Sequence, residues 1–168
     1  MKFREFVKEK RLILKIVLVL ILCLADLLSK AFFASYFYSG GETINLIGDF
    51  LQLTYVENTG AAFGSFSDYT IILTISSAIF VVTFILLDIL YFKYKSKLYI
   101  VGYTFVLAGA LGNFIDRLFL NYVRDFIRVS MFDFVCNIAD ILITVGVVLY
   151  AISLIMANSN TKGEVNEQ

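Results

Sequence analysis

Long apolar runs separated by short polar segments divide the chain into parts that could cross a membrane. A helix needs about 20 mainly apolar residues to span the hydrocarbon core of a bilayer. The pattern predicts four such helices, near Leu12–Ser35, Tyr69–Phe92, Leu98–Phe119 and Phe134–Ala157. Residues 36–68 form a long loop between the first two, and residues 158–168 form a polar tail that we expect to be disordered. The expected fold class is therefore an all-α membrane protein, a four-transmembrane-helix bundle in one domain over residues 1–168.

The long loop contains a second pattern. Residues 50–56, FLQLTYV, largely alternate apolar and polar side chains, which is typical of a β-strand with one face on lipid or protein. The following residues, ENTGAAFGSF, include Gly60 and other small residues that allow close approach of a backbone, with Asn58 beside them as a hydrogen-bonding side chain. A tight turn before the second span explains the same small residues. Physical reasoning alone favours that turn.

Composition agrees with a membrane protein and removes several kinds of chemistry. Hydrophobic residues make up 60% of the chain and charged residues 17%, which is too apolar for a soluble domain. The net charge is zero, so no basic excess indicates nucleic acid. The absence of histidine excludes Ser-His-Asp and Cys-His catalysis and a two-histidine zinc site. Cys23 lies in an apolar run and Cys136 has no obvious partner, so we expect no structural disulfide. We also expect no metal and no cofactor, so catalysis would have to use carboxylates, lysine or hydroxyl groups.

Basic residues indicate the orientation of the spans. Six of them lie before or at the start of the first span, and three lie between the second and third spans: Lys2, Arg4, Lys8, Lys10, Arg11 and Lys15, then Lys93, Lys95 and Lys97. Residues 36–68 contain no lysine or arginine. Because cytoplasmic loops are enriched in basic residues, we expect cytoplasmic termini and an external long loop. A cleavable secretory signal would also begin with basic residues, but Asp26 and Lys30 interrupt the run where a cleavage site would lie.

Polar residues inside the spans concentrate at one depth. With this orientation, three sets lie near the outer ends of the first, third and fourth spans: Asp26 and Lys30; Asn113, Asp116 and Arg117; Asn137 and Asp140. Spacings of three and four residues place each set on one helix face. A charged side chain at the centre of a membrane helix costs about 2.5–3.5 kcal/mol, so such groups usually face the bundle interior. Any one pair is explained equally well as an ordinary pair at the membrane boundary, and we interpret Asp88 as such a boundary residue. Three sets at one depth instead favour a polar pocket below the external surface.

The connection between the third and fourth spans supplies a candidate reaction. Asp125 and Asp140 flank it, so the chain can bring the two carboxylates together at the mouth of the pocket. Two carboxylates a few ångström apart cannot both ionise, which leaves one base and one acid. Such a pair can activate water for peptide hydrolysis without a covalent intermediate. A proton relay of a transporter would use the same residue types, although the inner halves of the spans are almost wholly apolar, and a non-catalytic assembly partner remains a further alternative.

Five short motifs occur in order along these spans: DLLSK (26–30), VENTGAAFG (56–64), GNFIDR (112–117), VRDF (123–126) and NIAD (137–140). In this order and spacing the chain resembles the lipoprotein signal peptidases, also called signal peptidase II. The resemblance implies an aspartic endopeptidase of the bacterial cytoplasmic (inner) membrane. Such an enzyme removes the signal peptide of prolipoproteins, cutting before a cysteine that carries diacylglycerol, and globomycin inhibits it. The implied partners are prolipoproteins, membrane lipid and globomycin-type inhibitors, without nucleic acid, and the chain is expected to be a monomer.

The resemblance also implies roles for individual residues. Asp125 and Asp140 would be the catalytic pair. Asn58 would bind the substrate backbone, with Gly60 in the same motif, Asn113 and Arg117 would hold the substrate, and Asp116 would fix Arg117. Asn137 would orient the pair, and Asp26 and Lys30 would support the site. The family further implies an external β-cradle and a short helix in the first loop.

Four residues near the predicted site remain outside these roles. Cys136 stands where the family usually has phenylalanine, which affects local packing. Arg124 and Arg128 have no family role, and we expect them at the outer surface, where they can meet lipid headgroups. Asp133, between two phenylalanines, is interpreted as a loop or lipid-surface residue without a role.

Overall fold

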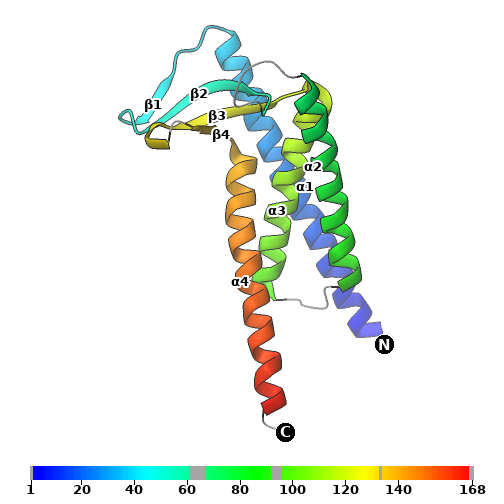
Figure 1. Ribbon diagram of the computed structural model, residues 1–168. Helices are drawn as coiled ribbons and strands as arrows, with labels where there is room; N and C mark the ends of the chain where they lie inside the picture. The colour runs from blue at the N-terminus through cyan, green and yellow to red at the C-terminus, as the bar shows by residue number, and fades with distance from the viewer. Residues whose placement is uncertain (1, 61–66, 92–95, 133, 167–168) are drawn as a thin grey trace.

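Four long helices stand side by side, and a small sheet covers one end of them (Figure 1). The computed structural model describes residues 2–60, 67–91, 96–132 and 134–166. The helices are α1 (Lys2–Tyr38), α2 (Ser67–Tyr91), α3 (Lys97–Leu120) and α4 (Ile138–Asn166). The strands are β1 (Ile44–Ile47), β2 (Leu51–Asn58), β3 (Val123–Val129) and β4 (Phe134–Cys136), with a 3-10 turn at Ser130–Phe132. In the described residues, each of the four helices contains a stretch long and apolar enough to cross a membrane, as the sequence predicts.

The fourth helix differs from the prediction at both ends. Phe134–Cys136 was expected to begin the span but forms strand β4, and α4 begins at Ile138. The start is set by Asn137 and Asp140, because the Asp140 backbone N–H donates to the Asn137 side chain at 3.0 Å and the Asn137 N–H donates to the Asp140 carboxylate at 3.1 Å. Such reciprocal bonds satisfy the free N–H groups of a first helical turn. At the other end the helix continues to Asn166, so the expectation of a disordered tail is wrong for residues 158–166.

The sheet is antiparallel in the order β1-β2-β3-β4, and it lies at the end of the bundle opposite the chain termini (Figure 1). The strand predicted at residues 50–56 is confirmed as β2. Its pairing with β3 places Val56 opposite Asp125 and Asn58 opposite Val123. The short helix expected in the first loop does not occur in residues 39–60, which form turns and strands. Residues 61–66, with the remaining small residues of the loop motif, lie outside the described part.

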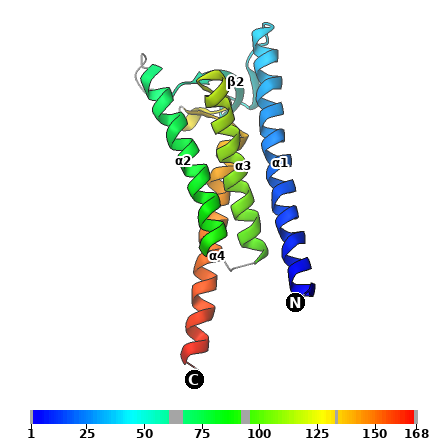
Figure 2. The same cartoon turned by 90° about the vertical axis from the view of Figure 1, so that its right-hand side faces the viewer.

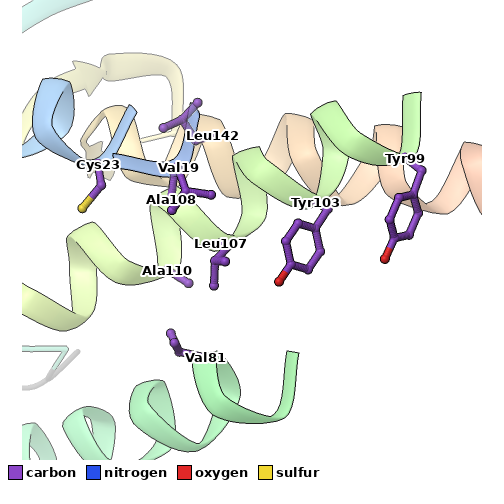
Figure 3. Packing of buried hydrophobic residues seen from close by; sticks show 9 residues of the cluster. All are labelled: Val19, Cys23, Val81, Tyr99, Tyr103, Leu107, Ala108, Ala110 and Leu142. Atoms are coloured by element: carbon purple, nitrogen blue, oxygen red, sulfur yellow. The ribbon is translucent and has the colours of Figure 1, made fainter. Parts of the chain in front are cut away.

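Helix α3 is the centre of the bundle and packs against α1, α2 and α4 (Figure 2). Its contact with α4 is very close at two glycines: a Cβ at Gly102 would lie 2.6 Å from the Tyr150 backbone nitrogen, and one at Gly109 would collide with the Ala139 carbonyl. Small residues allow membrane helices to approach in this way. The buried apolar cluster drawn in Figure 3 joins all four helices through Val19, Cys23, Val81, Tyr99, Tyr103, Leu107, Ala108, Ala110 and Leu142. This packing fixes the helices that carry the polar site.

At the end of the bundle opposite the sheet, Asp88 has specific partners. Its carboxylate lies 2.5 Å from the Lys15 Nζ and accepts a hydrogen bond from the Tyr99 hydroxyl. Lys15 also lies 4.6 Å from the centre of the Tyr103 ring. Asp88, which the sequence analysis interprets as a boundary residue, therefore links α2 to both α1 and α3.

Candidate active site

Lys30 is the centre of a buried charge network near the sheet-covered end of the bundle. Its side chain has no exposed surface, and its Nζ lies 2.8 Å from an Asp26 carboxylate oxygen and 3.6 Å from one of Asp116. The Nζ also donates a hydrogen bond of 2.8 Å to the Asn113 side-chain oxygen. A buried cation needs such partners, because an unpaired charge in a low-dielectric interior is costly. Lys30 thus joins α1 to the part of α3 that faces the site.

Asp26 connects the same network to the fourth helix. Its Oδ1 accepts a hydrogen bond of 2.8 Å from the Ala139 N–H, in the first turn of α4. N–H groups in the first turn of a helix lack partners within the helix, and a carboxylate there is also favoured by the helix dipole. Gly112 leaves the space that Asp26 occupies, since a Cβ at that position would collide with the Asp26 carboxylate. The first motif of the chain therefore holds the helix that carries Asp140.

The expected pairing of Asp116 with Arg117 is wrong. Asp116 binds Arg124 of strand β3 through three hydrogen bonds: from the Arg124 backbone N–H at 3.0 Å, from Nε at 3.2 Å and from Nη2 at 2.6 Å. Neighbouring residues of an α-helix point about 100° apart, so the side chains of Asp116 and Arg117 face different partners. Arg124, for which sequence reasoning found no role beyond the outer surface, instead fastens strand β3 to α3. Its position next to Asp125 in the VRDF motif was its only sequence signal.

The two candidate catalytic carboxylates are brought together through Asn137. Asp125 lies in β3 and is 1% exposed, whereas Asp140 lies in the first turn of α4. The Asn137 amide donates to Asp125 Oδ1 at 2.5 Å, and its backbone N–H donates to Asp140 Oδ2 at 3.1 Å. Asn58 donates to Asp125 Oδ2 at 2.8 Å, and Asn113 donates to Asp140 Oδ1 at 2.8 Å. Three amides therefore orient the pair from β2, α3 and the start of α4.

The surroundings of Asp125 favour a bound proton. Burial raises the pKa of this carboxyl group to about 6; the hydrogen bond from Asn58 opposes the rise, the charge of Asp140 adds to it, and Asn137 and Lys30 oppose it. Desolvation and a nearby carboxylate both disfavour the ionised form. A carboxyl with a pKa near neutrality can donate or accept a proton under ordinary conditions. The geometry therefore places a carboxyl group that keeps its proton up to about pH 6 beside a second carboxyl group.

Asp140 borders two cavities of opposite character. A cavity of about 590 Å³ between the sheet and α4 is almost entirely apolar, and its walls include Leu53, Phe126, Cys136 and Ile141. A second, of about 350 Å³, lies between α2, α3 and α4 and has a largely polar lining: Ser76, Ser77, Asn113, Arg117 and Asp140, with Phe80, Ala110 and Ile143. A substrate bound at Asp140 can therefore place an apolar part on one side and a polar part on the other.

Other residues of the sequence prediction have more indirect positions. Gly60 has φ of +77°, in the left-handed region, and its N–H donates to the Asn58 side chain at 2.8 Å, so it orients Asn58. Arg128 lies in β3 opposite Gln52, away from the carboxylate pair. Asp133 is outside the described residues. Within the described parts of the chain, the Asp, Glu and Cys side chains form no cluster of three that could hold a metal ion.

Sequence reasoning missed Ser77. The Arg117 Nη1 donates a hydrogen bond of 3.3 Å to the Ser77 hydroxyl, on the facing side of α2. The second span contains several hydroxyl residues in an apolar run, and nothing in the sequence distinguishes Ser77 from the others. Only the rotation of α2 against α3 selects it.

Known proteins resemble this chain along most of its length. A family model described as Signal peptidase (SPase) II matches residues 18–156. The lipoprotein signal peptidase of Fusobacterium nucleatum is 40% identical over 144 residues, covering 85% of this chain and 87% of its own. That of Lactobacillus gasseri is 40% identical over 151 residues, covering 88% and 96%. A solved structure described as a bacterial membrane enzyme, at 2.3 Å resolution, aligns with a TM-score of 0.71 at 30% identity, covering 87% of this chain and 90% of that one. The chain therefore belongs to the signal peptidase II family of aspartic peptidases.

Proposed function

We propose that the protein removes the signal peptide from diacylglyceryl-modified prolipoproteins, cutting before the lipid-modified cysteine. The single observation that carries the proposal is the Asp125–Asn137–Asp140 arrangement at the sheet-covered end of the bundle, in which Asp125 and Asn137 are buried and Asp140 is partly exposed. It combines the two carboxyl groups of an aspartic peptidase with amides that hold both in place. The names of the relatives support this substrate class.

In the proposed reaction, the Asp125–Asp140 pair holds one proton. The ionised carboxylate takes a proton from a water molecule, and the water oxygen attacks the carbonyl carbon of the scissile peptide bond. The protonated carboxyl donates its proton to the carbonyl oxygen, which gives a tetrahedral diol. A proton from the pair then passes to the leaving nitrogen while the C–N bond breaks, and one hydroxyl of the diol returns a proton to the pair as the C=O bond re-forms. The products are a signal peptide with a new carboxylate and a lipoprotein with a new amino group. The proton belongs to the pair, so the two groups titrate together.

The two cavities beside Asp140 support the proposal that the substrate is lipid-modified. The apolar cavity of about 590 Å³ runs along α4 below the sheet, where it can take the acyl chains of the diacylglyceryl group. The polar cavity offers Asn113 and Arg117 as donors for peptide carbonyl groups. Asn58 and Gly60 would complete the binding of the substrate backbone from the side of β2. An inhibitor of the globomycin type would compete for the same space.

The proposed location is the bacterial cytoplasmic membrane, with the active site near the external face. The four apolar helices support a multi-pass protein. The basic residues before α1 and between α2 and α3 favour cytoplasmic termini by the positive-inside rule. The sheet and the carboxylate pair would then lie on the external side, where exported prolipoproteins emerge. We propose that the chain works as a monomer.

The experiment that tests the function is cleavage of a diacylglyceryl-modified prolipoprotein by the purified protein in detergent. Wild type, Asp125→Asn and Asp140→Asn are compared, with Asp49→Asn as a control for the loss of an exposed external carboxylate. Folding of each variant is checked by thermal unfolding. We expect wild type and Asp49→Asn to cleave, and both dyad variants to be folded and inactive.

Two results would count against the proposal. Near-normal turnover by either dyad variant would make that aspartate structural. Absence of cleavage by folded wild type, together with proton movement across vesicles, would favour the relay of a transporter.

A further inference from the structure

Arg117 is a cation whose surroundings leave most of its donors available. The ion pairs formed within the described residues use Asp26, Asp88 and Asp116 as the anions and do not include Arg117. Its hydrogen-bond partner there is the Ser77 hydroxyl, at 3.3 Å. A guanidinium has five N–H donors in a planar fork, so several remain for a ligand in the polar cavity. The Arg117 side chain is half-buried, so the direction of its guanidinium decides which of these donors a ligand in the cavity can reach.

The Ser77 hydroxyl is itself held in one orientation. It donates to the Leu73 carbonyl of its own helix at 2.7 Å, which directs a lone pair toward Arg117. Leu73 also lies against Gly60, where a Cβ would collide with the leucine side chain. The outer part of α2 therefore contacts both the loop that orients Asn58 and the guanidinium of α3.

Without this hydrogen bond, the strongest electrostatic attraction on Arg117 comes from the catalytic pair. Three carboxylates act on the guanidinium: Asp140, which lines the same cavity, then Asp125 and Asp116. Asp116 is already neutralised by Lys30 and Arg124. An arginine released from Ser77 would therefore move toward Asp140 and form an ion pair with it. That pair would favour the doubly ionised dyad, which lacks the acid, and would remove a donor from the substrate.

We propose that Ser77 is a positioning residue of the peptidase: its hydroxyl holds the Arg117 guanidinium in the polar cavity, directed at the substrate and apart from Asp140. The inference rests on the proposed function and adds to it a residue of α2 outside the five sequence motifs. It also assigns α2 a part in the active site, through contact with α3.

The test compares Ser77→Ala and Ser77→Thr with wild type, and uses Thr74→Val as a matched control. Thr74 lies on the same helix, and its hydroxyl bonds to the Thr70 carbonyl. A typical intramolecular hydrogen bond corresponds to about a 3- to 10-fold change in an equilibrium, and we use this value because the bond between Arg117 and Ser77 is long, at 3.3 Å. We expect Ser77→Ala to raise KM about 3- to 10-fold and to move the alkaline limb of the kcat/KM profile to lower pH. Ser77→Thr keeps a hydroxyl and should recover both, and Thr74→Val should resemble wild type.

A double-mutant cycle separates positioning from a structural role. In an Arg117→Ala background, Ser77→Ala should cause no further loss, because the group it positions is gone. A variant that is merely less well folded would lower kcat at unchanged KM and leave the pH profile in place, which would overturn the inference. Equal KM values for wild type and Ser77→Ala would also overturn it.

A readout without turnover keeps this inference apart from the proposed function. The 15Nη NMR signals of the Arg117 guanidinium, assigned with Arg117→Lys, should show slowed rotation in wild type and Thr74→Val and faster or shifted exchange in Ser77→Ala. If wild type fails to cleave the prolipoprotein, the proposed function fails and the NMR result alone decides on Ser77. Unchanged Arg117 signals in Ser77→Ala would refute the positioning role even if cleavage is observed.

Discussion

Replacing Lys30 by methionine would remove a cation whose side chain has no exposed surface, at nearly constant volume. In the native protein this cation lies 2.8 Å from Asp26, 3.6 Å from Asp116 and 2.8 Å from the Asn113 oxygen. Asp116 keeps Arg124 as a partner at 2.6 Å. The carboxylate left without a counter-ion is therefore Asp26, which still accepts a hydrogen bond from Ala139.

The expected loss is large for a single substitution. Removing one partner of a buried ion pair destabilises a protein by about 3–5 kcal/mol, because the remaining charge stays buried without compensation. For a chain of this length, each kcal/mol corresponds to about 2–4 °C in Tm, so the loss predicts a decrease of about 6–20 °C. Adding Asp26→Asn removes the uncompensated charge, and the asparagine oxygen can still accept from the Ala139 N–H. The double variant should therefore recover a large part of the stability.

The two buried free cysteines, Cys23 and Cys136, provide the assay. A thiol-reactive fluorophore reports their exposure during thermal unfolding in detergent. Lys97→Met removes an exposed cation at the start of α3 and should leave Tm nearly unchanged. A Tm for Lys30→Met within the error of wild type would refute the reasoning. So would a double variant less stable than Lys30→Met, because it would show that the charge of Asp26 does not need Lys30.

Three further predictions concern the site. Burial raises the pKa of Asp125 to about 6, so the singly protonated pair should be lost above about that pH, and kcat/KM should fall on the alkaline side. A kcat/KM profile that is flat through this region would contradict the assignment. The free energy of unfolding should also decrease as pH rises from about 4 to about 6, because the folded state holds this proton more tightly than the unfolded chain does. Asn58→Ala removes a hydrogen bond that stabilises the ionised form of Asp125, so the alkaline limb of the kcat/KM profile should move to higher pH and kcat/KM should fall about 10-fold or more. An alkaline limb at the same pH as in wild type would show that Asn58 does not bind Asp125 in solution. Gly112→Ala introduces a Cβ against the Asp26 carboxylate and should lower Tm and activity together, as measured by the same dye assay and by cleavage; an unchanged Tm would mean that α1 and α3 are less closely packed than described.

The placement of the spans followed from local sequence properties. A run of about 20 apolar residues crosses a bilayer whatever its neighbours are, so the four helices could be predicted from hydrophobicity alone. The alternation in residues 50–56 likewise predicted β2, because alternation of side chains is a property of one strand. The start of α4 was misplaced because Phe134–Cys136 is as apolar as a helix end, and its pairing with β3 is a long-range contact.

The residue types of the candidate site were also visible in the sequence. Asp26, Lys30, Asn113, Asn137 and Asp140 lie at one depth because helix length and orientation decide depth, and the structure brings them into one hydrogen-bonded network. Their catalytic and binding roles remain predictions that the cleavage experiments test. The polar tail shows the limit of composition: polar residues 158–166 continue α4 because a helix already begun gains one hydrogen bond for each residue added.

Only the tertiary structure decided which side chains meet. Asp116 binds Arg124 and not its neighbour Arg117, and Arg117 meets Ser77, because the rotation of each helix about its axis and the register of β3 set the direction of each side chain. Hydrophobicity along the chain determines that a segment enters the membrane and how deep each residue lies. Helix rotation depends on close packing such as that at Gly102 and Gly109, where α3 meets α4. That packing is a property of two segments together, so no pattern within one of them could predict it.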